Sequence, residues 1–196
     1  MNFKALRIYE ENGTFIRKIV ERDINELPEG EVLIKVKYSS LNYKDALSCI
    51  GNRGVTREYP HTPGIDAAGI VEDSKVSEFI KGEEVFITGY DLGMNTDGGF
   101  GEYVRVPANW VVKKPANLSL KEAMTYGTAG FTSALSVFEL IKEVAPEDGD
   151  ILVIGAGGGV GSHSVKFLTK LGYSVTAVVN DEKGIEYAKE LGASAC

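Results

Sequence analysis

The sequence predicts an α/β protein with a β-rich first domain, residues 1–122, and a second domain that contains a βαβ unit, residues 123–196. Two observations lead to this prediction. The first 115 residues hold short β-like runs with Gly and Pro between them, which is typical of a small β-barrel or sandwich. Near the C-terminus, two short apolar runs flank a glycine-rich turn and an amphipathic stretch, as expected for a strand, a helix and a second strand.

The first domain begins with a predicted β-hairpin. Residues 6–9 and 15–20 are strand-like and are joined through Asn12-Gly13, a dipeptide that favours a tight hairpin turn. In residues 32–38, apolar side chains alternate with lysines, which predicts a half-exposed strand. Shorter strands are expected at residues 67–72, 84–88, 102–106 and 110–112.

Two helices are predicted before the βαβ unit. Ser119 and Glu122 have the spacing of a capping box, so a first helix should begin there. Gly127 and Gly130 should interrupt it, because glycine weakens a helix interior. Residues 131–143 then predict a second helix.

The βαβ unit is predicted from residue 151 onward. Residues 151–154 form an apolar run too short for a helix, so they predict a buried strand. Residues 155–161 are mostly glycine and let the backbone turn sharply with its N–H groups uncovered. A helix over residues 160–171 should follow, with Gly172 at its C-terminal cap. A helix that begins at a bare glycine turn presents free N–H donors and the positive end of its dipole, which suits a pyrophosphate.

The glycine spacing departs from the usual GxGxxG fingerprint. Val160 stands where the last glycine would be required, whereas Gly155, Gly158 and Gly161 fit a looser variant. Asp181, twenty positions after Gly161, supplies the acidic residue expected after the second strand. A glycine-rich turn in an ordinary α/β domain without a nucleotide is the alternative. The cofactor contacts expected in this turn are Gly155, Gly157, Gly158, Gly159, Val160 and Gly161.

Composition bears on partners and location. The formal net charge of −7 argues against a general nucleic-acid-binding protein, which would carry a basic face. The sequence shows neither the apolar core of a signal peptide nor a run of about eighteen apolar residues, so we expect a cytoplasmic protein with no membrane partner. Cys49 and Cys196 show no disulfide framework, and Cys49 is expected to be a buried, unreactive thiol.

Several motifs, in order along the chain, resemble those of the medium-chain dehydrogenase/reductase family. They are Ser-Leu-Asn-Tyr-Lys-Asp-Ala at 40–46, Pro-Gly-Ile-Asp-Ala-Ala-Gly at 63–69, Gly-Gly-Phe-Gly-Glu-Tyr at 98–103, Tyr-Gly-Thr-Ala-Gly-Phe-Thr at 126–132 and the glycine turn at 155–161. Most of them resemble the quinone oxidoreductase branch, and within it the bacterial acrylyl-CoA reductase subgroup. The resemblance implies a GroES-like β-barrel domain followed by a Rossmann domain.

The resemblance also implies a longer protein, because members of this family continue well beyond the length of this chain. The chain stops where the third strand of the Rossmann domain should begin, so this domain is expected to be incomplete. Half a Rossmann domain should expose a sheet edge and helix faces. For the full-length protein the resemblance implies a homodimer.

By resemblance, the chain lacks the ligands of the zinc-dependent relatives. Asn42 stands where they place Cys or His, and Ile65-Asp66 replaces their His-Glu. His61 is expected to be a solvated loop residue, and His163 to pack or face solvent within its helix. The four-cysteine structural zinc lobe is missing as well, so no metal site is expected.

Without zinc, the chemistry implied by the resemblance is hydride transfer from a nicotinamide to a small-molecule substrate. Tyr43 is expected beside the nicotinamide as the proton donor for an activated C=C; the alternative is a packed tyrosine with its hydroxyl capped. Asn42 should hold the loop backbone through its amide, and Lys44 and Asp45 should form a loop ion pair. Thr128 resembles a position that contacts the nicotinamide ribose or phosphate, or it caps a helix.

The choice of cofactor is open between two interpretations. An acidic residue after the second strand usually binds the ribose 2′-OH of NAD, which Asp181 could do. By resemblance, Val179-Asn180-Asp181 aligns with a Ser-Gly-Arg of NADP-binding relatives. This chain therefore has Asp181 where those relatives have an arginine. Asn180 and Lys183 could contact a 2′-phosphate instead, and we prefer NADP(H) over NAD(H). The alternative for Asp181 and Lys183 is that they are solvated residues in the first turn of the next helix.

Three functions therefore follow from the sequence. The first is a zinc-independent, NADPH-dependent reductase of an activated C=C, such as acrylyl-CoA or another enone, or of a quinone. The second is an NAD(P)H-binding protein without catalytic activity. The third, a metal-dependent alcohol dehydrogenase, is disfavoured by the missing ligands.

Overall fold

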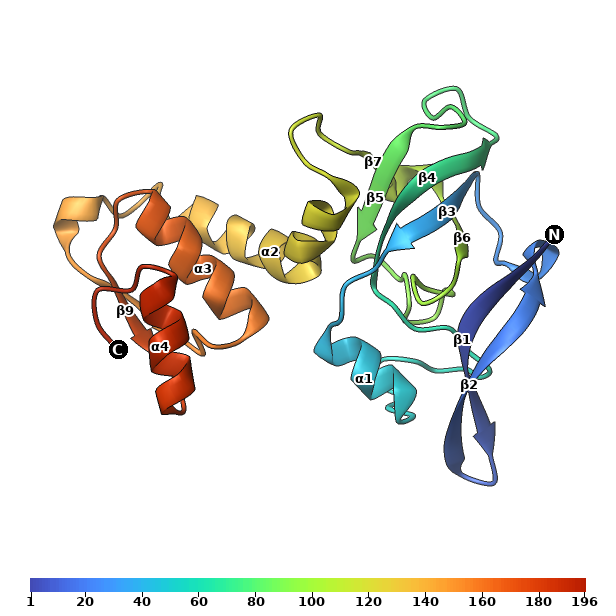
Figure 1. The fold of residues 1–196 in the computed structure, drawn as a ribbon, viewed down its shortest axis with the longest axis horizontal. Helices are drawn as coiled ribbons and strands as arrows, with labels where there is room; N and C mark the ends of the chain where they lie inside the picture. The colour runs from blue at the N-terminus through green and yellow to red at the C-terminus, as the bar shows by residue number, and fades with distance from the viewer. The chain divides into compact units, whose positions relative to one another are not determined.

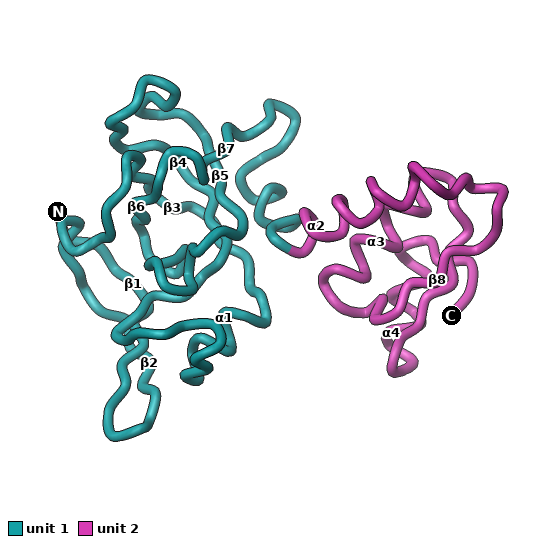
Figure 2. Tube along the Cα trace, turned by 180° about the vertical axis from the view of Figure 1, so that it is seen from behind, with its two compact units in different colours: residues 1–128 teal, residues 129–196 magenta.

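The computed structural model describes residues 1–196 and divides them into two units, Met1–Thr128 and Ala129–Cys196 (Figure 2). The boundary lies within a long helix, after residue 128, whereas the sequence places it after residue 122. Each unit has its own hydrophobic core. None of the helices is both long enough and apolar enough to span a bilayer.

The first unit is built mainly from antiparallel strands. Strands β1 and β2 form a hairpin, and the other five form one sheet in the order β6-β3-β4-β5-β7, of which β3, β4 and β5 run side by side in Figure 1. A short helix, α1, follows β3. The bounds are β1 Asn2–Glu11, β2 Thr14–Asp23, β3 Val32–Tyr38, α1 Tyr43–Cys49, β4 Asp66–Ser74, β5 Glu84–Thr88, β6 Tyr103–Val106 and β7 Val112–Lys113, with 3-10 turns η1 Ile24–Glu26 and η2 Ala108–Trp110.

The predicted hairpin is confirmed. Asn12 and Gly13 both have positive φ, 52° and 77°, which a two-residue hairpin turn requires and which these two residue types adopt most readily. The alternation in residues 32–38 is confirmed too. Val32 and Ile34 are fully buried, while Lys35 and Lys37, which follow in the same strand, are exposed.

The strand predicted at residues 110–112 is wrong in part. Pro107, with φ of −57°, starts the 3-10 turn η2, and the strand begins only at Val112. Trp110 ends this turn and stacks on Tyr90 with ring centroids 5.3 Å apart. The sequence pattern had assigned the Trp110 side chain to the strand, but it packs against Tyr90 instead.

Helix α2, Leu120–Leu140, begins at the predicted capping box. Glu122 N lies 3.1 Å from Ser119 Oγ, and Ser119 N lies 2.8 Å from Glu122 Oε2. Gly127 breaks the helix with φ of 49° and ψ of −153°. Gly130 does not interrupt it, so that prediction is wrong: a glycine lowers helix propensity but does not by itself end a helix that packs.

The second unit confirms the predicted βαβ unit. Strands β8 and β9 pair in parallel and are followed by one helix each. Val153, Val165 and Val175 are buried together in its core. Gly172, with φ of 90°, follows the end of α3 as expected for its cap. The bounds are η3 Pro146–Asp148, β8 Ile151–Ile154, α3 Gly159–Lys170, β9 Val175–Val178 and α4 Glu182–Glu190.

The sheet of the second unit has two named strands, as expected for an incomplete Rossmann domain. Leu152 and Ile154 of β8 are apolar, yet 58% and 77% of their surface is exposed. Side chains of this kind are buried when both faces of a parallel sheet are covered.

Candidate nucleotide groove and active site

A groove of about 450 Å³ lies at the carboxyl ends of β8 and β9 in the second unit. It is the place where parallel α/β sheets bind ligands. Gly155 leaves β8 with φ of 73°, and Gly158 is the N-cap of α3. The first N–H groups of this twelve-residue helix have no partner within the helix. The lining is Gly155, Gly157, Gly158, Val179, Asn180, Asp181, Lys183, Gly184 and Tyr187.

The glycines of this turn differ in how much space a side chain would find at each position. A Cβ on Gly157 would meet nothing within 4 Å, and one on Gly158 would lie 3.4 Å from Gly155 O. A Cβ on Gly161 would come within 2.3 Å of Gly155 O. Gly157 and Gly158 therefore keep space clear in front of the helix, whereas Gly161 lets α3 pack closely on the turn. A dinucleotide pyrophosphate fits this arrangement.

Most of the cofactor residues predicted in the second unit come together. Gly155, Gly157 and Gly158 share the groove with the four predicted residues after β9, from Val179 to Lys183. Gly159, Val160 and Gly161 form the first turn of α3 instead. The sequence interpretation missed Gly184 and Tyr187, which also line the groove. Tyr187 could have been found from its position four residues after Lys183, because residues four apart lie on the same face of a helix.

Asp181 is the N-cap of helix α4. Its Oδ1 accepts a hydrogen bond from Gly184 N over 2.8 Å. Asp181 is exposed and lines the groove, so it lies where the sequence placed it but also has a structural partner. Lys183 lies in the first turn of α4, and its side chain is exposed.

In the first unit, Tyr43 is the first residue of helix α1 and exposes 80% of its surface. The alternative interpretation, a packed tyrosine, is therefore wrong. The helix begins here because Asn42 N donates to Asp45 Oδ2 over 2.7 Å, which caps the first turn.

Asp45 does not form the predicted ion pair with Lys44. It is 1% exposed, and its Oδ1 accepts hydrogen bonds from Gly64 N and Ile65 N over 3.1 and 3.0 Å. Lys44 Nζ instead lies 3.9 Å from Met94 Sδ. Loss of hydration raises the pKa of Asp45, and the backbone donors oppose this effect. The carboxylate thus ties the start of α1 to the loop before β4.

Asp66, the first residue of β4, is fully buried, and its carboxylate accepts hydrogen bonds from three residues. Oδ2 accepts from Asn42 Nδ2 and from Thr128 N, each over 2.9 Å, and from Ser40 Oγ. Oδ1 accepts from Thr128 Oγ1 over 2.6 Å. Asn42 thus binds side chains rather than the loop backbone that was predicted, and Thr128 binds Asp66. A buried Asp within an apolar run, Ile65-Asp66-Ala67, was the sequence signal for this cluster.

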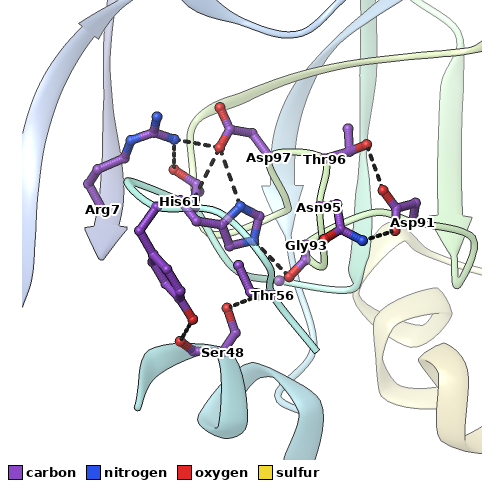
Figure 3. Close-up of polar contacts among 12 residues, drawn as sticks. Arg7, Ser48, Thr56, His61, Asp91, Gly93, Asn95, Thr96 and Asp97 are labelled. Carbon is purple, nitrogen blue, oxygen red and sulfur yellow. Dashed lines mark hydrogen bonds and ion pairs between the residues drawn. The ribbon is translucent and has the colours of Figure 1, made fainter. Parts of the chain in front are cut away.

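The prediction that His61 is a solvated loop residue is wrong. Only 3% of His61 is exposed; its Nε2 lies 2.9 Å from Gly93 O and its Nδ1 lies 3.8 Å from Asp97 Oδ1 (Figure 3). Burial lowers the pKa of His61, which favours the neutral ring. The proline-rich loop that holds His61 pairs with β1 through hydrogen bonds to Ile8, and this pairing brings it inside.

Asp97 lies at the centre of a buried ion cluster that sequence reasoning missed. Its Oδ1 is 2.5 Å from Arg7 Nη1 and its Oδ2 is 2.6 Å from Arg22 Nη1. Thr62 N also donates to Oδ1 over 3.1 Å. The cluster joins both strands of the hairpin to two loops. Arg22 Nε also lies 3.2 Å from Glu26 Oε2, so each of the two guanidinium groups has a carboxylate partner.

Cys49 is partly rather than fully buried, and burial raises the pKa of its thiol. A raised pKa disfavours the reactive thiolate. No group of three or more His, Cys, Asp or Glu residues has the arrangement of a metal site.

The chain was compared with protein families, curated proteins and solved structures. The alcohol dehydrogenase GroES-like domain family matches residues 28–116. "Putative quinone oxidoreductase YhfP" of Bacillus subtilis is 52% identical over 86% of this chain and 52% of its own length. "Acrylyl-CoA reductase AcuI" of Ruegeria pomeroyi is 42% identical over 94% of this chain and 56% of its own length. The chain belongs to the medium-chain dehydrogenase/reductase family.

Within this medium-chain dehydrogenase/reductase family, the chain groups with the quinone oxidoreductase and acrylyl-CoA reductase branch. The structure of the yhdH oxidoreductase of Salmonella enterica in complex with NADP superposes with a TM-score of 0.95 at 43% identity, over all of this chain and 60% of that one. Bacillus subtilis yhfP with NAD bound gives 0.95 at 46% identity, also over all of this chain and 60% of that one. The chain thus spans between 52% and 60% of the length of these relatives.

Proposed function

We propose that this chain is part of a zinc-independent, NADPH-dependent reductase whose substrate is an activated C=C, such as that of acrylyl-CoA or another enone, or a quinone. The observation that carries the proposal is the open space at Gly157 and Gly158, in front of the first turn of α3 and beside a groove of about 450 Å³. The names of the relatives, quinone oxidoreductase and acrylyl-CoA reductase, support the two substrate classes.

The residues of the second unit fit a dinucleotide. The N–H groups at the start of α3 would donate to the pyrophosphate, and Gly157 and Gly158 would let it approach the backbone. Asn180 and Lys183 would donate to a 2′-phosphate, and the exposed Lys183 would also neutralise part of its charge. These two donors are why NADP(H) is preferred here. The Asp181 carboxylate would oppose that phosphate, so NAD(H) is kept as the alternative cofactor.

When bound, the reduced nicotinamide supplies the hydride for the reduction. In the first unit, Tyr43 would hold the proton that the α-carbon of an enone must gain, either directly or through a water. Its exposed position at the start of α1 leaves the hydroxyl accessible to a ligand. Thr128 would contact the nicotinamide half of the cofactor.

A titration followed by turnover tests the proposal. The full-length protein is titrated with NADPH and with NADH by fluorescence, and then assayed with acrylyl-CoA and with a quinone. We expect tighter binding of NADPH and turnover of at least one substrate. Binding without turnover of any enone or quinone would instead show a cofactor-binding protein without catalytic activity. No binding of either nucleotide would reject the proposal.

A further inference from the structure

A pocket of about 750 Å³ lies in the first unit, where the end of β3 and the middle of β4 face the segment that leads into α2. Pockets that bind small molecules usually have volumes of this order. The charged residues in its lining are Lys37, Lys114, Lys121 and Glu84. Neither Tyr43 nor any residue of the dinucleotide groove lines this pocket, so it is separate from both.

The lysines of this pocket differ in their partners. Lys114 Nζ lies 3.2 Å from Glu84 Oε2 and donates to two carbonyl oxygens of the loop that follows it. An ammonium group has three protons, so Lys114 is fully used and the charge of Glu84 is neutralised. Lys37 and Lys121 are exposed and have no ion-pair partner. Both of their charges are therefore available to an anion, in a chain whose net charge is −7.

The uncharged part of the lining suits a ring as well as an anion. Tyr38 exposes 44% of its surface, and Ile70 and Leu118 are partly exposed apolar residues. The amide of Asn117 adds a polar group that can donate or accept hydrogen bonds. Nucleotide bases stack on aromatic side chains, and lysines bind phosphates through charge-assisted hydrogen bonds. The pocket therefore fits a phosphorylated nucleoside.

This pocket lies within reach of the proposed proton donor. Tyr38 and Tyr43 are five residues apart, so their Cα atoms are at most about 18 Å from one another. Leu41, between them, exposes 86% of its apolar surface. In coenzyme A, the pantetheine arm joins the sulfur to the phosphates through a chain about as long as four residues, about 14 Å when extended. The two lengths are comparable.

We propose that this pocket binds the phosphorylated adenosine end of an acyl-CoA substrate. Lys37 and Lys121 bind its phosphates, Tyr38 contacts the adenine, and the pantetheine arm passes Leu41 toward Tyr43. The inference rests on the proposed function and deepens it. It selects a CoA thioester over a quinone or a free enone, because neither of these has a phosphate or a base to place in the pocket.

The first test compares acrylyl-CoA with acrylyl-pantetheine, which has the same thioester but neither phosphates nor adenosine. The full-length wild type and the double variant Lys37→Gln/Lys121→Gln are assayed with NADPH. We expect the double variant to raise the KM for acrylyl-CoA by about tenfold or more and to leave kcat unchanged, because the lost contacts are remote from the reacting bond. The KM for acrylyl-pantetheine should be the same in both proteins.

A matched control removes the same charge elsewhere. Lys75→Gln/Lys189→Gln replaces two exposed lysines that line neither this pocket nor the dinucleotide groove. This control should have the wild-type KM for both thioesters. Added salt should raise the KM for acrylyl-CoA in the wild type more than in Lys37→Gln/Lys121→Gln, because salt screens exposed charges.

The second test measures binding without turnover. The protein is saturated with NADP⁺, so that the dinucleotide groove is filled, and is then titrated with coenzyme A by calorimetry. We expect the Kd for coenzyme A to rise by about tenfold or more in Lys37→Gln/Lys121→Gln. Adenosine 3′,5′-bisphosphate should compete with coenzyme A, and pantetheine should compete far less.

The outcomes separate this inference from the proposed function. An equal KM for acrylyl-CoA in the wild type and Lys37→Gln/Lys121→Gln would overturn the inference, and so would an equal loss in the control variant. Free ADP that binds as tightly as coenzyme A, with no effect of the two lysines on turnover, would make the pocket a site for free nucleotides and also overturn it. A wild type that binds coenzyme A through these lysines but reduces no thioester, enone or quinone would reject the proposed function and keep the pocket as a coenzyme A site.

Discussion

Tyr43 combines an exposed aromatic ring with a rigid position. It exposes 80% of its surface at the first position of α1, where the capping bond between Asn42 N and Asp45 holds the helix start. A general acid, the role proposed for Tyr43, contributes about 10²–10⁴-fold to a rate. Tyr43→Phe keeps the ring and removes the proton donor.

For Tyr43→Phe, we expect kcat on an activated alkene to fall by about 10²–10⁴-fold while the affinity for NADPH changes little. A quinone should be affected less, because its reduced oxygens can take protons from solvent. The measurement is steady-state kinetics on both substrates. Small and equal losses on both would assign Tyr43 to packing against the cofactor.

His61 should make the stability of the protein depend on pH. Burial lowers the pKa of the folded histidine below the value of about 6.5 in an unfolded chain. As the pH falls below about 6.5, the unfolded state binds a proton that the folded state does not, so the free energy of unfolding decreases.

We expect His61→Gln, which can still donate to Gly93 O but does not titrate, to lose less stability than the wild type between about pH 7.5 and about pH 5.5. Urea unfolding at both pH values measures the free energy of unfolding of each protein. His163→Gln removes the other histidine and is the control. Equal pH dependence in the wild type and His61→Gln would contradict the assignment.

At the scale of elements, the start of α3 separates two kinds of glycine. Gly158 has φ of −86°, and a Cβ there would make only an ordinary contact, so the fold can accept a side chain. A Cβ on Gly161 would lie 2.3 Å from a backbone oxygen, so that position cannot accept one without movement.

Gly158→Val should therefore abolish dinucleotide binding with little change in the melting temperature, because the side chain fills the space of the pyrophosphate. Gly161→Ala should instead lower the melting temperature. Fluorescence titration and thermal unfolding of both variants check this. Unchanged affinity in Gly158→Val would show that the glycine turn is purely structural.

The N-cap of α4 allows the charge of Asp181 to be separated from its structural role. Asn is as good an N-cap as Asp, so Asp181→Asn should keep the bond to Gly184 N and remove the negative charge. We expect the preference for NADPH over NADH to rise, by up to about tenfold if the carboxylate opposes a 2′-phosphate. Asp181→Ala should in addition cost about 1 kcal/mol of stability. An unchanged ratio of the two Kd values in Asp181→Asn would place the carboxylate away from the phosphate.

For the whole molecule, the hydrogen bonds of Asn42 and Asp66 bear on whether the protein uses zinc. By resemblance, Asn42 and Asp66 stand at the positions of the metal ligands in zinc-dependent relatives. They bind one another over 2.9 Å, and the remaining partners of the Asp66 carboxylate are Ser40 and Thr128. We expect dialysis against a chelator to leave turnover of acrylyl-CoA or a quinone unchanged, and added zinc not to raise it. Metal analysis of the purified protein gives an independent measurement, and about one zinc per chain would contradict the expectation.

Local sequence determined those parts of the molecule whose causes lie within a few residues. The Asn12-Gly13 turn, the alternation in β3, the capping box at Ser119 and the glycine turn after β8 all depend on neighbours in the chain, so their positions were predicted. The groove residues after β9 followed from the order of strand, turn, helix and strand.

Tertiary structure alone decided the partners of the buried polar groups. Arg22 reaches Asp97 across 75 positions and Thr128 reaches Asp66 across 62, and no local pattern encodes such distances. The same holds for His61, which was expected in solvent, and for Asp45, which was expected in an ion pair with Lys44; both are buried. A polar side chain can be buried only where the fold supplies its hydrogen bonds, and those donors and acceptors are assembled by strand pairing and loop packing rather than by the neighbouring sequence.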